Sequence, residues 1–140
     1  MQRRADLIPN LVGTINSQMQ IDNATIETAN DARINAKAVY LDISQLSDAQ
    51  QVQKYVLAQQ EVQDSVAKLL AAGQANAELK ANESFITLQY QLEGLENRIN
   101  VSREQIAALT HKFNYSIHKF PGTVVNKLFL HLDRKELFKA

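Results

Sequence analysis

An apolar stripe that recurs in steps of three and four residues runs through the second half of the chain. Such steps place side chains on one face of an α-helix and give the heptad seam of coiled coils and helical bundles. No proline interrupts it, so the stripe predicts one long helix from about Asn82 to Phe120. Its members are Phe85, Leu88, Leu92, Leu95, Ile99, Ser102, Ile106, Leu109, Phe113, Ser116 and Phe120.

A second stripe follows the sequence Ser47-Asp48-Ala49-Gln50, which has the form of a capping box. It predicts a helix from about Asp48 to Ala72 that stops at Gly73, with residues 74–80 as a polar connector. The apolar positions of this stripe are Val52, Val56, Val62, Val66, Leu69 and Leu70.

The first segment has a weaker stripe, and the chain after Phe120 begins with a turn. Asp22 and Asn23 interrupt the first stripe, so this segment is either one long helix or two helices joined there. The pair Pro121-Gly122 predicts a turn. Thr123 is then expected to cap a short helix that reaches about Leu130, followed by a loosely held tail from Asp133. The first stripe comprises Ile8, Leu11, Ile15, Met19, Ile26, Ala29, Ala36 and Tyr40.

These segments predict an all-α fold. Only four glycines and two prolines occur among 140 residues, a composition that favours helices. Amphipathic helices with short connections must cover one another's apolar faces. We therefore expect a single domain, residues 1–140, built as an antiparallel up-and-down helical bundle of three long helices plus a short C-terminal helix.

The composition argues against several kinds of function. Fifteen basic and fifteen acidic residues leave no net charge, so we expect no nucleic-acid partner. The chain has no cysteine and hence no thiol nucleophile. Its longest apolar runs fall far short of the ~20 residues of a membrane-spanning helix, so we expect this chain alone to be soluble.

We expect no metal and no cofactor. Di-iron bundles use Glu-x-x-His pairs, and the sequence has none. His111 and His118 share a helix face away from the stripe, which predicts two solvated side chains. His131 stands alone, and Gly94 is expected to mark a close approach between helices.

A charged and amide cluster beside the seam is the candidate site. It comprises Glu93, Glu96, Asn97, Arg98 and Arg103. One interpretation is a polar network that fixes the register between helices, against Arg3, Arg4 or Asn10. The other is a patch that binds a partner or a ligand.

Three stretches in order resemble the signature of the LemA family. They are RRADLIPNLV at residues 3–12, LKAN at residues 79–82 leading through Phe85, Leu88 and Gln89 into LEGLENRI at residues 92–99, and finally Asn114, Ile117 and the FPG triplet at residues 120–122. Together they span nearly the whole chain. Asn10 and Asn114, which lie in these stretches, complete the candidate interaction or register cluster.

The resemblance implies a LemA-like four-helix bundle and a single transmembrane helix just upstream of the RRADLIPNLV stretch in the native protein. We therefore expect the native protein in the cell membrane, tethered by an N-terminal helix that this chain lacks. The chain departs from the family pattern at Gly13, Ile21-Asp22 and Ile106-Ala107, where the family often has Glu, His-Glu and Tyr-Asn.

The preferred hypothesis is a non-enzymatic, membrane-tethered scaffold or interaction module of the bacterial cell envelope, with an unknown protein partner at the membrane. The rival is a ligand-binding or hydrolytic bundle that uses the cluster from Glu93 to Arg103. A third hypothesis is a homo-oligomer whose seams continue between chains.

Overall fold

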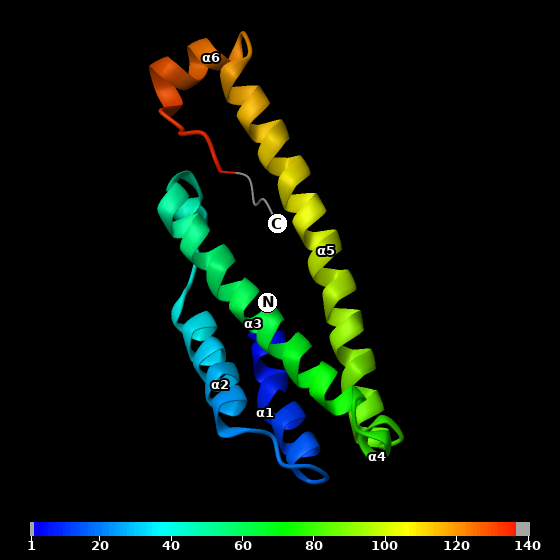
Figure 1. Cartoon of the computed structure of the whole chain (residues 1–140). Helices are drawn as coiled ribbons and strands as arrows, with labels where there is room; N and C mark the ends of the chain where they lie inside the picture. Colours follow the sequence, from blue (N-terminus) through cyan, green and yellow to red (C-terminus); the bar gives the residue numbers. More distant parts are fainter. Residues whose placement is uncertain (1, 137–140) are drawn as a thin grey trace.

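The structure, a computed structural model, describes residues 2–136 and is all-helical there (Figure 1). Four long helices run alternately in opposite directions, and short helical turns join or follow them. This confirms the all-α, up-and-down bundle with a short C-terminal helix. The long helices are α1 (Gln2–Asn16), α2 (Asn23–Ala38), α3 (Ala49–Gln74) and α5 (Glu83–His118); the short ones are η1 (Ile43–Ser47), α4 (Ala77–Lys80), α6 (Gly122–Val125) and the π-helical η2 (Asn126–Leu130).

The first segment is two helices, not one. Asp22 caps the second of them, α2, by accepting a hydrogen bond from the N–H of Thr25 at 2.6 Å. The polar residues that interrupt the apolar stripe therefore start a new helix. This cap resolves the alternative that the sequence left open.

The ends of α3 differ from the prediction. Asp48 is the N-cap, accepting from the N–H groups of Gln50 and Gln51, so the capping box predicted at Ser47 is wrong. Gly73 does not stop the helix either. It lies inside α3, where a Cβ atom would come within 2.4 Å of the Phe85 ring.

The predicted polar connector after α3 contains a helical turn, α4, and a core residue. Asn76 caps α4 by accepting from the N–H groups of Glu78 and Leu79, and the Leu79 side chain is fully buried. One buried leucine among polar neighbours is enough to dock the turn.

The core lies where α1 packs against α2, α3 and the first half of α5. Its largest fully buried side chains come from all three predicted stripes and, in the case of Leu79, from α4. They are Ile8, Leu11, Ile15, Val62, Leu69, Leu79 and Phe85.

The seam of α5 is buried only in its first half. Ile106, Leu109 and Phe120 are exposed, and the buried face continues through Thr110, Asn114 and Ile117 instead. A strict heptad stripe drifts by about 20° per heptad on an uncoiled helix of 3.6 residues per turn. Over four heptads the apolar stripe therefore turns away from the packed face.

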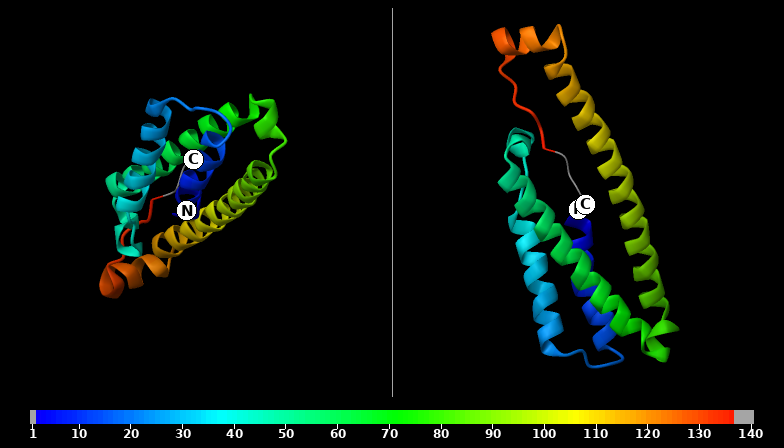
Figure 2. Two further views of the ribbon diagram at one scale, coloured as in Figure 1. Left: turned by 90° about the horizontal axis from the view of Figure 1, so that it is seen from below. Right: turned by 45° about the horizontal axis from the view of Figure 1, so that its top comes forward.

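The distal half of α5 runs past the ends of the other long helices, as Figures 1 and 2 show. Thr123 does not cap the next helix, because α6 begins at Gly122 without a side-chain cap. The segment after η2 returns toward η1 and is hydrogen-bonded there through Lys135 and Glu136, so the prediction of a loose tail is wrong for these residues. Its last part, residues 137–140, lies outside the described residues.

Candidate functional site

Arg4 and Glu96 join α1 to α5 beside the predicted cluster. The Nη2 atom of Arg4 lies 2.5 Å from Oε1 of Glu96. Arg4 is 2% exposed, whereas 38% of the Glu96 side chain reaches solvent. The ion pair therefore has one buried and one partly solvated partner.

The buried guanidinium of Arg4 is incompletely compensated. Burial lowers the pKa of Arg4 and the nearby charge of Arg103 lowers it further, whereas Glu96 raises it. Among the described residues, Nε and Nη2 have no aligned hydrogen-bond partner despite the short contact with Glu96. Burying a charged donor without a full set of hydrogen bonds costs free energy.

The remaining cluster residues do not converge on one point. Asn10, Glu93, Asn97 and Arg98 are exposed. Arg103 is half-buried on α5, and its charge acts on Arg4 and on Tyr55 of α3. Burial raises the pKa of Tyr55, and Arg103 lowers it. The sequence analysis missed Tyr55, since nothing in the pattern of α3 separates it from its neighbours.

Two adjoining hollows lie along the contact of α1 and α5, and we call them together the α1–α5 trough. They have volumes of about 480 and 340 Å³ and share Arg3, Leu95 and Arg98 as lining residues. The first is also lined by Leu7, Gln91 and Gly94, and the second by Arg4, Tyr55 and Ile106. A trough of this size holds a short peptide segment or a small molecule.

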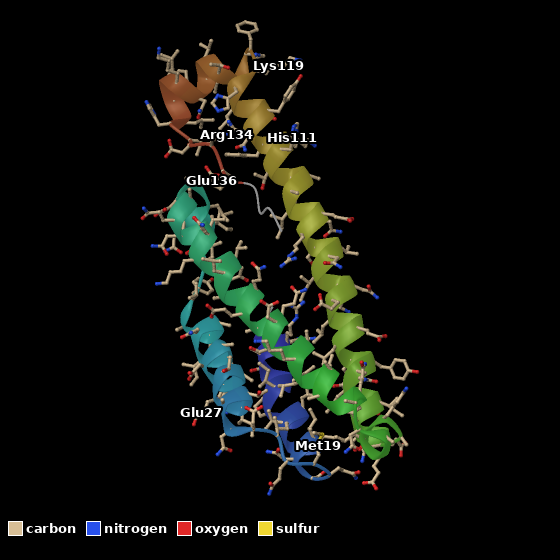
Figure 3. All side chains as sticks on the ribbon, in the orientation of Figure 1. Met19, Glu27, His111, Lys119, Arg134 and Glu136 are labelled. Carbon is tan, nitrogen blue, oxygen red and sulfur yellow. The ribbon has the colours of Figure 1, made fainter. Side chains whose placement is uncertain are left out.

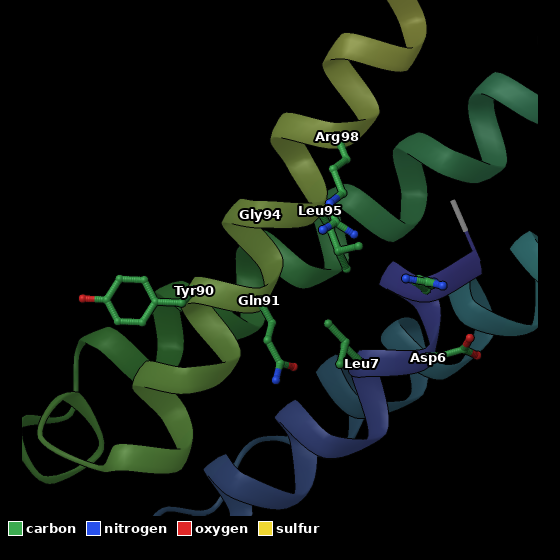
Figure 4. A pocket seen from close by; sticks show the side chains of 8 residues that line it. Asp6, Leu7, Tyr90, Gln91, Gly94, Leu95 and Arg98 are labelled. Atoms are coloured by element: carbon green, nitrogen blue, oxygen red, sulfur yellow. The ribbon is translucent and has the colours of Figure 1, made fainter.

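The close view of the first hollow shows how its lining side chains point (Figure 4). Leu95 and Arg98 project from α5 toward α1, and Leu7 projects from α1 toward α5. Tyr90 and Asp6 point outward. The floor is therefore apolar, with a guanidinium group at its edge.

The sequence predicted that Gly94 marks a close approach of two helices, and this prediction is wrong. A Cβ atom at this position would meet nothing within 4 Å, and the residue is exposed on the wall of the trough. Gly94 therefore lines the first hollow without packing against another helix.

The charge balance of the trough is positive. Asp6 forms an ion pair with Lys37 of α2, 2.6 Å apart, and Glu96 is paired with Arg4. Within residues 2–136, neither Arg3 nor Arg98 forms an ion pair with a carboxylate. The trough thus presents two uncompensated arginines in a chain of zero net charge.

Asn114 belongs to a different contact, far along α5 from the trough. Its amide donates to the carbonyl of Lys135 and accepts from the N–H of the same residue, both at 2.8 Å. The Nζ atom of Lys135 donates to Ser47 Oγ at 2.7 Å, and the N–H of Glu136 donates to the carbonyl of Leu46. We call this set the tail clasp, since it ties distal α5 to η1; Figure 3 labels Arg134 and Glu136 on the returning segment.

The three histidines are exposed, and His131 has a left-handed backbone conformation with φ of 50°. In the part of the chain that is described, no three histidine, aspartate or glutamate side chains gather to hold a metal ion. Nor does any of its helices combine the length and apolar character needed to cross a bilayer.

The sequence model of the LemA family matches residues 1–140, the full length of the sequence. No functionally curated relative matches the chain.

Proposed function

The chain belongs to the LemA family, and from this premise we propose that it is a non-catalytic, membrane-tethered interaction module of the bacterial cell envelope. Its α1–α5 trough binds a partner protein through a segment that carries apolar side chains and at least one carboxylate.

The arginines of the trough carry this proposal. Arg3 and Arg98 lack a carboxylate, and buried Arg4 shares a single one. Guanidinium groups next to an apolar floor bind a carboxylate in a bidentate way while the floor takes up apolar side chains. Arginine is also enriched at protein interfaces.

The placement of the carboxylates favours binding over catalysis. Glu96 is already paired with Arg4, and Glu93 is exposed on the surface of α5. An acid–base pair would need two carboxyl groups in one site with pKa values held apart by their surroundings.

Two substitutions in the trough test the binding. Gly94→Leu adds a bulky side chain at the wall of the first hollow, and Arg98→Glu reverses a charge there; Gly13→Leu is the matched control, because Gly13 is also an exposed helical glycine with open space around it. After chemical cross-linking in the native host, we expect one envelope protein to copurify with the wild type and with Gly13→Leu. The same protein should be lost from both trough variants. Equal recovery with all variants would place the contact elsewhere.

The membrane tether is supported by the family resemblance and is tested separately. We expect alkaline carbonate to leave the native protein in the membrane pellet, in a chain heavier than this one. Release into the supernatant would refute the tether and leave the trough proposal standing.

The rival function is a ligand-binding or hydrolytic bundle. The volume of the trough favours it, because a hollow of this size also suits a small ligand. Turnover of a small substrate that is lost in Glu93→Gln or Glu96→Gln, while the helical content stays unchanged, would overturn the non-catalytic proposal.

A further inference from the structure

The end of the molecule farthest from the core carries a second surface, unrelated to the trough. We call residues 118–132 the distal tip; it comprises the end of α5, the turn at Pro121, α6 and η2. Phe120 is 80% exposed and Phe129 76% exposed, and Leu128, Leu130 and Val124 are exposed as well. Large exposed apolar side chains concentrated on one short segment point to a binding surface.

The distal tip has a fixed shape. Asn126 accepts a hydrogen bond from the N–H of Leu132 at 2.8 Å and donates to its carbonyl at 3.0 Å, closing the loop after η2. Gly122 packs so tightly on α5 that a Cβ atom would lie 2.0 Å from the carbonyl oxygen of Ser116. These contacts fix the backbone that carries the apolar side chains, at an end that protrudes from the bundle (Figures 1 and 2).

The distal tip and the part of α5 that leads to it carry basic but no acidic side chains. From Gln105 to Leu132 the chain contains no Asp and no Glu, although acidic and basic residues are equal in number over the whole chain. The same stretch carries Lys112, Lys119 and Lys127. Lys119 lies on the tip (Figure 3), with its ammonium group 4.8 Å from the centre of the Tyr115 ring.

We propose that the distal tip binds the surface of a lipid bilayer that contains anionic lipids, with Phe129 and Leu128 entering the interface and Lys119 and Lys127 contacting lipid headgroups. Exposed aromatic and leucine side chains flanked by lysines are the signature of interfacial membrane binding. Lysine stems can lie along the apolar region while their ammonium groups stay at the headgroups.

The chemistry of the tip fits a bilayer better than a protein. Protein interfaces are depleted of lysine. A protruding end meets a flat, fluid surface without a preformed pocket, whereas a protein partner would need a matching cavity. The trough, with its arginines and recessed floor, shows the contrasting features on the same molecule.

A single tryptophan tests the contact, because the chain contains none. Phe129→Trp is compared with Leu57→Trp, which places the probe on an exposed position of α3. With vesicles of equal parts phosphatidylglycerol and phosphatidylcholine, we expect a blue-shifted emission and quenching by brominated acyl chains only for Phe129→Trp. No response, or the same response from both probes, would overturn the proposal.

The charge requirement is tested by vesicle sedimentation. Each lysine near an anionic surface contributes enough that Lys119→Gln with Lys127→Gln should lower the partition coefficient by roughly thirtyfold. The control pair, Lys54→Gln with Lys68→Gln on α3, should change it little. Equal binding to vesicles of phosphatidylcholine alone would refute the role of the lysines.

The apolar requirement is tested by Leu128→Ser with Phe129→Ser, which should abolish binding while far-ultraviolet circular dichroism stays that of the wild type. If the tip instead mediates dimers, sedimentation velocity will show self-association that this variant removes, without vesicle binding; that result overturns the proposal in favour of a second copy. Gly94→Leu in the trough should leave vesicle binding unchanged, so failure of one proposal does not imply failure of the other.

Discussion

Arg4 holds a positive charge at a position where only 2% of its surface reaches solvent, and the partly exposed carboxylate of Glu96 compensates it. Removing one partner of a buried ion pair is costly, because the other charge stays in a medium of low dielectric constant. Replacing both partners by groups of similar shape is far less costly. We therefore propose that the pair serves to fix the register of α1 and α5 more than to stabilise the fold.

Single and double substitutions separate the cost of leaving one charge unpaired from the net contribution of the pair to stability. We expect Glu96→Gln to lower the free energy of unfolding by about 1–3 kcal/mol, since Glu96 is partly solvated. Arg4→Met with Glu96→Gln should return it to within about 1 kcal/mol of the wild type. Urea denaturation measures both. A double variant that is less stable than Glu96→Gln would contradict this account.

Gly73 provides a second residue-level prediction. A methyl group there would meet the fully buried ring of Phe85, so Gly73→Ala should destabilise the protein by about 1–3 kcal/mol, although alanine favours helices. Gly13→Ala has open space and should stabilise it by about 0.5–1 kcal/mol. The midpoint of thermal unfolding measures both effects. A midpoint for Gly73→Ala above that of the wild type would show that the Phe85 ring can move aside.

Residues of the core could be predicted from the sequence, whereas the partner of Glu96 could not. Periodicity places Ile8, Leu11 and Phe85 on buried faces, but it leaves the register between two helices undefined. Arg3, Arg4 and Asn10 therefore stayed alternative candidates. Only the packed structure shows that Arg4 is buried against Glu96 and that Arg3 faces the trough.

At the scale of elements, the tail clasp holds the distal half of α5. Asn114→Ala removes two hydrogen bonds to Lys135 and should lower the free energy of unfolding by about 1–3 kcal/mol. The amide of Glu136, bonded to Leu46, should then exchange with solvent faster in hydrogen–deuterium exchange. Asn100→Ala, an exposed position on the same helix, is the control. Unchanged exchange at Glu136 in Asn114→Ala would mean that the tail is held without the clasp.

The cap of α2 makes folding depend on pH. The side chain and N–H of Thr25 donate hydrogen bonds to the carboxylate of Asp22 and lower its pKa. Because the folded pKa is lowered, this stabilisation is present above the ordinary value of about 4 and is lost as pH falls through the folded pKa. Asp22→Asn should therefore lose less stability on acidification than the wild type or Asp31→Asn, as measured by urea unfolding. Equal losses in all three would refute the role of the cap.

The helices themselves could be predicted, but the packing of the distal half of α5 could not. The heptad stripe from Phe85 to Phe120 predicted one continuous helix correctly. It also implied a packed seam along the whole length, and this failed because the stripe drifts away from the packed face and leaves Ile106, Leu109 and Phe120 exposed. Sequence periodicity assigns residues to one face of a helix, but it does not show which part of that face the neighbouring helices cover.

The whole molecule combines a packed end and an extended end. The core and the trough lie where α1 packs on α5, and the distal tip stands beyond the ends of α2 and α3 (Figure 2). The sequence pointed to Arg98 and Glu96 as candidates, and both lie at or beside the trough. It gave no indication of the hollow, since the residues that line it come from two helices whose relative placement periodicity does not define.

The central claim is that a partner protein occupies the α1–α5 trough. Site-specific photo-cross-linking in the native host tests it most directly, with a photoreactive phenylalanine analogue at Gln91 in the trough and, as control, at Gln63 on the exposed face of α3. We predict one discrete adduct from position 91, lost when Arg98→Glu is added, and no such adduct from position 63. The same adducts from both positions, or none from position 91, would contradict the claim.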